Sequence, residues 1–161
     1  MKSFKEFEEK HKDGTFVAAW LDASTSKKLE KFLDDLEIKG QVTPDNYHST
    51  IIYSEAGIPK AENEKFETPF KGTFKEWKIF PNRIEGGNYL VAIIESAPLE
   101  KYHKRMIDLG GKTIFPTYHA HVSCSSKFTG KMPKETPDFD FVYDKVTVAP
   151  RDPNFKPKRK N

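Results

Sequence analysis

Two short segments of the sequence, YHSTIIYS and HAHVSCSS, each carry a histidine followed two residues later by a hydroxyl side chain. The pairs are His48 with Thr50 and His121 with Ser123, 73 positions apart. In a β-strand, residues i and i+2 point to the same face, so each segment presents an imidazole beside a hydroxyl. Histidine has an unperturbed pKa of about 6.5 and can give or take a proton near neutral pH. Two such pairs around one phosphate suit phosphodiester cleavage without a metal, with two imidazoles for proton transfer and two hydroxyls as donors to the non-bridging oxygens.

The elements that must position these pairs form an internal duplication. FVAAWLDAS, a helix, a proline-containing loop and YHSTIIYS make one unit, and YLVAIIESAP, a helix, a proline-containing loop and YHAHVSCS make the other. Val17 precedes His48 by 31 positions, and Val91 precedes His121 by 30. Each unit reads as strand–helix–strand, with its histidine at the same place. The two units cover about residues 15–54 and 89–126.

Periodicity and turn residues predict the remaining elements. Apolar residues at helical spacing indicate a helix over 24–38, and Pro98 opens a second one that Gly110-Gly111 ends. The segment 57–64 is loop-like, and 70–80 is typical of one bent strand or two short ones. Gly86-Gly87 indicates a hairpin, and Phe139, Phe141 and Tyr143 alternate as in a strand over 138–149. We expect a flexible basic tail over 156–161.

Composition narrows the class of protein. The 161 residues fit one domain, and the net charge of +3 favours anionic partners but lacks the dense basic stripe of a duplex-binding protein. The single Cys124 cannot form an internal disulfide, and we expect it to pack in the core. No apolar run approaches the ~20 residues of a membrane span, and the charged N-terminus differs from a signal peptide. These features predict a cytoplasmic protein without membrane contact.

The two motifs, each in a hydrophobic strand of a duplicated unit, resemble those of the two-histidine (2H) phosphoesterase superfamily over about Thr15 to Ala149. The short length, the SFKEF opening and YHSTIIYS most resemble phage anti-CBASS phosphodiesterases, which degrade the cyclic oligonucleotide messengers of bacterial antiphage immunity. The resemblance implies an α+β fold of two pseudo-symmetric strand–helix–strand lobes, with antiparallel sheets lining a central cleft. It also implies that residues 1–161 form a single catalytic domain.

Carried over residue by residue, the resemblance implies that His48 and His121 are the acid–base pair and that Thr50 and Ser123 bind the phosphate. It further implies cleavage of 3′–5′ bonds of a cyclic di- or trinucleotide in the host bacterial cytoplasm, with no metal or other cofactor and the ribose 2′-OH as nucleophile. A 2′,3′-cyclic phosphate could then be opened by water with the histidine roles reversed. Ser123 stands where threonine is common in the family; it keeps the donor but lacks the methyl group that restricts χ1.

Several residues admit two interpretations. His119 precedes His121 by two positions, so it either orients the pocket or completes a zinc site with His48; the sequence lacks a further cluster at ligand spacing, which disfavours zinc. Trp77 and Phe155 either stack on a nucleobase or serve as core or lid packing. Two further histidines, His11 and His103, are expected on the surfaces of amphipathic helices.

Two other functions fit the same motifs. A phosphodiesterase with this site could act on linear 2′–5′ oligonucleotides, 2′,3′-cyclic phosphate ends or RNA. A non-catalytic protein could instead bind a cyclic nucleotide and release it intact on denaturation. The second alternative is disfavoured because pure binding has no need of two groups that titrate near neutrality.

Overall fold

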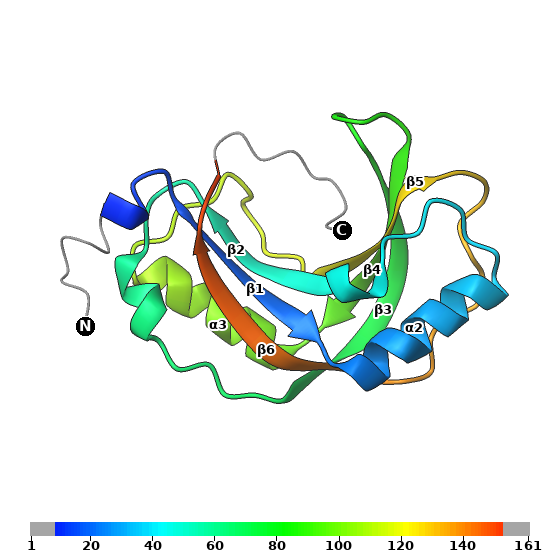
Figure 1. Cartoon of the computed structure of the whole chain (residues 1–161), viewed down its shortest axis with the longest axis horizontal. Coiled ribbons are helices and arrows are strands. Elements are labelled where there is room, and N and C mark those ends of the chain that lie inside the picture. Colours follow the sequence, from blue (N-terminus) through cyan, green and yellow to red (C-terminus); the bar gives the residue numbers. More distant parts are fainter. Residues whose placement is uncertain (1–8, 153–161) are drawn as a thin grey trace.

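Residues 9–152, which the computed structural model describes, form a six-stranded antiparallel sheet and two α-helices (Figure 1). The strand order is β2-β1-β6-β3-β4-β5. The elements are β1 (Thr15–Leu21), α2 (Ala23–Asp35), η1 (Pro44–Asn46), β2 (His48–Ser54), η2 (Pro59–Asn63), β3 (Phe70–Pro81), β4 (Asn88–Glu95), α3 (Ala97–Asp108), β5 (His121–Phe128) and β6 (Phe141–Pro150). The predicted α+β fold is confirmed, and the segment at 57–64 contains the short 3₁₀ helix η2 instead of a plain loop.

The sheet consists of two three-stranded halves joined by a short seam. β2, β1 and β6 form one half and β3, β4 and β5 the other, and β6 pairs with β3 over only three residues, from Phe70 opposite Tyr143 to Gly72 opposite Phe141. Strong curvature brings the outer strands β2 and β5 back toward each other (Figure 1). The strands that carry the two histidine motifs are therefore last in the sheet order but neighbours in space.

Each helix packs against the half of the sheet that belongs to the other repeat. In α2, Leu29 and Leu33 are buried, and Phe32 stacks on Trp77 of β3 with ring centroids 6.3 Å apart. In α3, His103 is hydrogen-bonded to the carbonyl of Ile51 on β2. Figure 1 shows α2 beside β3, and α3 contacts β2. The two units are thus interlocked, and neither buries its apolar face alone.

Side chains alternate between a core face and a second face of the sheet. On β1 the core face carries Val17, Ala19 and Leu21, and on β5 it carries Val122 and Cys124. Cys124 is fully buried, so its predicted packing role is confirmed. Because strand residues alternate in direction, the remaining positions of the motif strands must lie on the opposite face.

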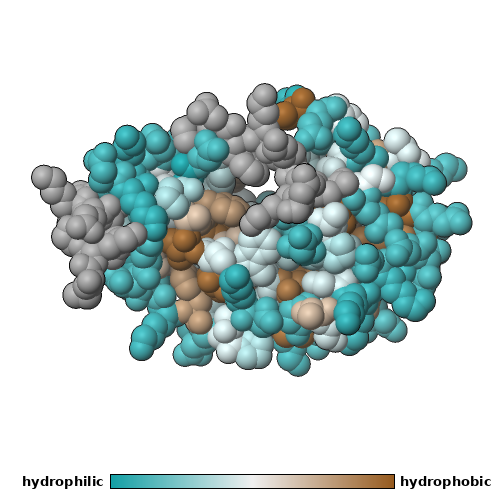
Figure 2. Space-filling view, in the orientation of Figure 1, coloured by the Kyte–Doolittle hydropathy of each residue, from teal (hydrophilic) through white to brown (hydrophobic). Residues whose placement is uncertain are grey.

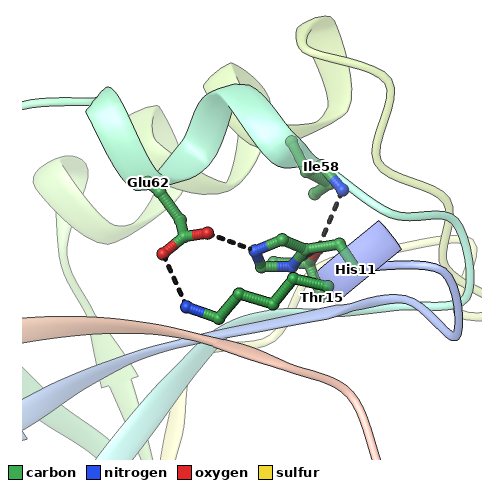
Figure 3. Close-up of polar contacts among 5 residues, drawn as sticks. His11, Thr15, Ile58 and Glu62 are labelled. Atoms are coloured by element: carbon green, nitrogen blue, oxygen red, sulfur yellow. Dashed lines mark hydrogen bonds and ion pairs between the residues drawn. The ribbon is translucent and has the colours of Figure 1, made fainter. Parts of the chain in front are cut away.

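A buried hydrogen-bonded group attaches the segment before β1 to η2 (Figure 3). His11 Nε2 donates to Glu62 Oε2 over 2.8 Å, and His11 Nδ1 lies 2.8 Å from Thr15 Oγ1. Thr15 Oγ1 also accepts from the backbone N–H of Ile58 at 2.8 Å, and Lys10 forms an ion pair with Glu62 at 2.9 Å. His11 is only 1% exposed, so the expectation of a surface residue is wrong. Helical periodicity cannot show that a later segment covers this face.

Hydrophilic residues cover most of the rim of the molecular face in Figure 2, while paler and hydrophobic residues gather toward its middle. No helix within residues 9–152 is long and apolar enough to cross a membrane. The predicted basic tail at 156–161 lies outside the described residues.

Candidate active site

A buried hydrogen-bond chain joins the two motif strands. Ser49, between His48 and Thr50, donates its hydroxyl proton to the backbone carbonyl of His121 over 2.8 Å. Because that proton is used, Ser49 Oγ accepts from the hydroxyl of Tyr143, 2.7 Å away. Ser49 and Tyr143 are both fully buried. The chain ties the start of β2 to the start of β5, and so brings together two histidines that are 73 positions apart in the sequence.

The two motif histidines make the same backbone contact. His48 Nδ1 lies 2.8 Å from the carbonyl oxygen of Asn46, and His121 Nδ1 lies 2.9 Å from that of His119. A carbonyl oxygen only accepts hydrogen bonds, so Nδ1 carries the proton in both rings. The reactive nitrogen of each ring is therefore Nε2, which accepts a proton when the ring is neutral and donates one when it is charged.

Burial lowers the pKa of both motif histidines. For His48, the hydrogen bond to Asn46 opposes this shift, and the nearby charge of His121 adds to it. For His121, the hydrogen bond to the carbonyl of His119 opposes the shift and the charge of the His119 ring adds to it. The effect of His121 on His48 shows that the two imidazoles are within electrostatic reach of each other. The neutral state of the pair is favoured at pH 7.

The hydroxyls of Thr50 and Ser123 lie on the same strand faces as their histidines. Within residues 9–152, neither hydroxyl has a hydrogen-bond partner in the protein. Both side chains are half-buried. A hydroxyl that makes no other bond can donate to a phosphate oxygen without first breaking an internal contact.

Aromatic rings flank both histidines. The ring of Trp20 lies 4.8 Å from that of His48 at a tilt of 36°, and Phe16 approaches His48 edge-on at 6.2 Å. Phe80 approaches His121 edge-on at 6.4 Å and is 41% exposed. These rings help to exclude water from the imidazoles and leave π-faces near the reactive nitrogens.

The register of the first half of the sheet places a lysine on the site face. Trp20 of β1 pairs with His48 on one side and with Lys145 of β6 on the other. Lys145 is therefore two strands from His48, or roughly 10 Å at the usual strand spacing. The hydrogen bond from Trp20 Nε1 to Thr147 Oγ1, at 2.8 Å, shows that these β6 residues share the face of Trp20.

The second half of the sheet repeats this arrangement. Val91 of β4 pairs with Ser123 on one side and with Lys78 of β3 on the other. Lys78 and Lys145 are both exposed, and no ion pair joins either one to a carboxylate of the described part of the chain. Glu76, two residues before Lys78 on the same face, contributes the opposite charge.

The three further residues that the sequence suggested as substrate contacts have different outcomes in the structure. Trp77 is 5% exposed, packs against Phe32 and Phe74, and donates its Nε1–H to the carbonyl of Glu135 over 2.8 Å. This burial contradicts base stacking by Trp77 and agrees with the packing interpretation. His119 is exposed, and its carbonyl orients His121.

Phe155 lies outside the described residues. Among residues 9–152, no three histidine, cysteine, aspartate or glutamate side chains gather closely enough to hold a metal ion.

Several residues of this site could not be selected from the sequence. Strand register brings four residues to the site from distant parts of the sequence: Ser49, Trp20, Phe80 and Tyr143. In the sequence each of them looks like an ordinary strand residue. His103, expected on a helix surface, is half-buried and binds the carbonyl of Ile51. The spacing of Phe16 and Trp20, four residues apart on β1, is a sequence signal that could have indicated a shared aromatic face.

Comparison with known proteins agrees with this geometry. The family model described as "Anti-CBASS protein Acb1" matches residues 13–156. The Acb1 protein of Vibrio phage KVP40 is 28% identical over 112 residues, which cover 70% of this chain and 72% of the relative. The Acb1 protein of Enterobacteria phage T4 is 29% identical over 126 residues, which cover 78% of this chain and 77% of the relative.

Among solved structures, E. coli LigT in its apo form matches with a TM-score of 0.56 at 12% identity. The alignment covers 83% of this chain and 84% of that chain. The fold is therefore similar to that of LigT. The match of the family model over residues 13–156 confirms the predicted resemblance to phage anti-CBASS proteins.

Proposed function

The chain belongs to the anti-CBASS protein Acb1 family, and from this premise we propose that it is a metal-independent phosphodiesterase that cleaves 3′–5′ bonds of cyclic di- and trinucleotide immune messengers. The general anti-CBASS role follows from the family. The observation that carries the enzymatic proposal is the matched state of His48 and His121. Both rings use Nδ1–H to hold a backbone carbonyl and keep Nε2 for chemistry.

The reaction needs one neutral and one protonated histidine. The neutral Nε2 removes the proton of the ribose 2′-OH as the 2′-oxygen forms a bond to phosphorus. The bond from phosphorus to the 5′-oxygen breaks, and the protonated Nε2 of the other histidine gives its proton to that oxygen. The product end is a 2′,3′-cyclic phosphate. Water then opens it with the two roles exchanged, and both imidazoles return to their starting states.

Thr50 and Ser123 act on the charge that builds on the phosphate. Their hydroxyls donate to the non-bridging oxygens, where negative charge is concentrated in the transition state. The hydrogen bond from Ser49 to His121 holds the two pairs at a constant separation. Such preorganisation means that no donor has to be reoriented during the reaction.

Two features of the site face support a substrate with more than one phosphate. Lys78 and Lys145 each lie two strands from a motif residue and are exposed, so they can meet phosphates other than the one being cleaved. Trp20 and Phe80 flank the two histidines, and an aromatic face stacks on any nucleobase. A cyclic oligonucleotide presents both phosphates and bases in one ring.

The test is incubation of the purified protein with a panel of cyclic di- and trinucleotides in EDTA, followed by mass spectrometry of the products. We expect linear products with 2′,3′-cyclic or 3′-phosphate ends. The variant His48→Asn/His121→Asn should be folded and inactive, whereas Lys31→Gln, changed on the outer surface of α2, should match the wild type.

Failure to form linear product, or full activity in the double histidine variant, would refute the proposal. Recovery of intact cyclic nucleotide after tight binding would favour the binding protein instead. Faster cleavage of 2′–5′ oligonucleotides or RNA than of cyclic messengers would favour the other phosphodiesterase.

A further inference from the structure

Two side chains outside the motifs hold the backbone of β2 directly behind Thr50. The hydroxyl of Tyr118 donates to the carbonyl of Thr50 over 2.8 Å. His103 Nδ1, which must carry a proton because its partner is a carbonyl, donates to Ile51 over 2.7 Å. The rings of His103 and Tyr118 are stacked, with centroids 4.2 Å apart and an angle of 10° between their planes.

The two carbonyls belong to a β-bulge. On β1, Val17 pairs with Ile52 and the next residue, Ala18, pairs with Thr50, so Ile51 is an extra residue on β2. In a regular strand, successive carbonyls point to opposite sides. Here the two donors lie on adjacent stacked rings, so both carbonyls are directed to one place. A bulge of this kind bends its strand and changes the direction of neighbouring side chains.

The other motif strand has a bulge at the equivalent position. On β4, Val91 pairs with Ser123 and Leu90 pairs with Ser125, so Cys124 is the extra residue. Ile51 and Cys124 each follow the motif histidine by three positions and the motif hydroxyl residue by one. Two bulges at equivalent positions of a duplicated unit indicate a common role. Each bulge sets the direction of the hydroxyl side chain one residue before it.

The two bulges are held by different groups. The carbonyl of Cys124 accepts from the backbone N–H of Val42 at 3.0 Å. Both motif strands are at an edge of the sheet, but the segment around Gln41 bridges to Ser125 and so lies beside β5. At β2 the carbonyl of Ile51 accepts from the side chain of His103 instead. Burial raises the pKa of Tyr118, so its hydroxyl stays protonated and able to donate. The stacked pair thus holds the bulge of β2 by side-chain hydrogen bonds, whereas a neighbouring backbone segment holds the bulge of β5.

We propose that His103 and Tyr118 are positioning residues for Thr50. They hold the Ile51 bulge so that the Thr50 hydroxyl meets the same phosphate as His48 Nε2. The inference rests on the proposed function, since it assigns a phosphate to Thr50. Neither residue touches the substrate; both act on the backbone at and after Thr50.

The decisive variant is Tyr118→Phe, which removes only the hydroxyl and keeps the stacked ring. With whichever phosphodiester the wild type cleaves, we expect kcat to fall about tenfold, because small misplacements of catalytic groups are costly. KM should change less than about twofold. In a Thr50→Val background the same change should have no further effect on kcat, and in a Ser123→Ala background it should again cost about tenfold. His103→Phe, which keeps a ring but removes the donor, should follow the same pattern.

The matched control is Tyr102→Phe. Tyr102, a buried tyrosine that also has backbone partners, bonds to the N–H and carbonyl of Glu67, away from the motifs. Its loss should lower the melting temperature without changing kcat. The proposal is overturned if Tyr118→Phe, shown to be folded by its melting curve, leaves kcat unchanged. It is also overturned if its effect is equally large in wild-type and Thr50→Val proteins.

A second measurement separates this inference from the proposed function. Binding of inorganic phosphate, followed by NMR titration, requires no turnover. Tyr118→Phe should weaken phosphate binding severalfold in the wild-type background and leave it unchanged with Thr50→Val. If the wild type cleaves no cyclic nucleotide but phosphate binding to the single and double variants shows this coupling, the proposed function fails and the positioning role stands. If phosphate binding shows no coupling to Thr50, the positioning role fails.

Discussion

The Ser49 hydroxyl donates to the backbone carbonyl of His121 at 2.8 Å, and this bond joins the middle residue of one motif to the histidine of the other. Ser49 is fully buried and also accepts from Tyr143. The distance between the two histidine–hydroxyl pairs is thus set by a contact between two strands that lie at opposite ends of the sheet order. A residue that would be read as a neutral spacer in H-x-T holds the two halves of the site together.

Replacing Ser49 by alanine should therefore affect both stability and rate. The variant leaves the buried Tyr143 hydroxyl and the His121 carbonyl without their partner, at a cost of about 1–3 kcal/mol in the free energy of unfolding. Urea unfolding measures this cost. In the folded fraction, kcat should fall because the hydrogen bond that fixes the two histidine–hydroxyl pairs relative to each other is lost. Adding Tyr143→Phe should recover part of the stability but none of the rate, and recovery of both would contradict the linking role.

The pH dependence of the reaction should show the lowered pKa values of both histidines. Activity requires one neutral and one protonated imidazole, so kcat/KM falls below the lower pKa, where no base remains, and above the higher pKa, where no acid remains. Because burial lowers both values below the ordinary value of about 6.5, the maximum should lie below pH 6.5. Initial rates measured at subsaturating substrate between pH 4 and pH 9 check this. A maximum at pH 7 or above would show that the free protein does not keep these imidazoles neutral.

The two lysines of the site face should matter only for substrates with several phosphates. Lys78→Gln and Lys145→Gln should each raise KM severalfold for a cyclic trinucleotide, with little change in kcat. Each should also reduce the salt dependence of binding by about 0.7 in log–log slope, as expected for loss of one phosphate contact with a single strand. A 2′,3′-cyclic mononucleotide, with one phosphate, serves as the control substrate. Equal effects on both substrates would argue against contacts to the outlying phosphates.

The buried group around His11 should contribute to stability and not to catalysis. His11→Ala removes one hydrogen-bond partner from Glu62 and one from Thr15, and we expect a loss of about 1–3 kcal/mol in the free energy of unfolding. Burial alone would raise the pKa of Glu62, but hydrogen bonds and charges from Lys10 and His11 outweigh it and lower that pKa. A carboxyl group whose pKa is lower in the folded than in the unfolded protein stabilises the fold at pH values above its unfolded pKa. This contribution disappears as the pH falls through the folded pKa.

Thermal unfolding of the wild type and of Glu62→Gln between pH 3 and pH 7 measures the contribution of Glu62. The difference in melting temperature between the two proteins should shrink toward acid. The kcat of His11→Ala at a temperature where it is folded should equal that of the wild type. A large loss of kcat there would place His11 in the catalytic machinery.

Much of the fold could be predicted because it depends on local patterns. The helix predicted over 24–38 from apolar residues at helical spacing is α2, which spans Ala23–Asp35. The strand at 48–54 followed from its hydrophobic run with a histidine and a hydroxyl at period two. Errors arose where distant segments decide the environment. Trp77 could be read from the sequence as a base-stacking residue, but Phe32 of α2 packs against it. His11 could be read as a surface residue of a helix, but Glu62 of η2 lies beside it and it is buried.

The sequence by itself determined that a histidine and a hydroxyl, the groups proposed to carry the chemistry, occur twice at equivalent positions. Strand alternation, which is a property of the backbone, places each histidine and its hydroxyl on one face. Only the tertiary structure decided that β2 and β5 meet, that Ser49 bonds to His121 and that the His103–Tyr118 pair holds the bulge behind Thr50. These contacts join residues dozens of positions apart and depend on sheet curvature and strand register, which no local pattern specifies.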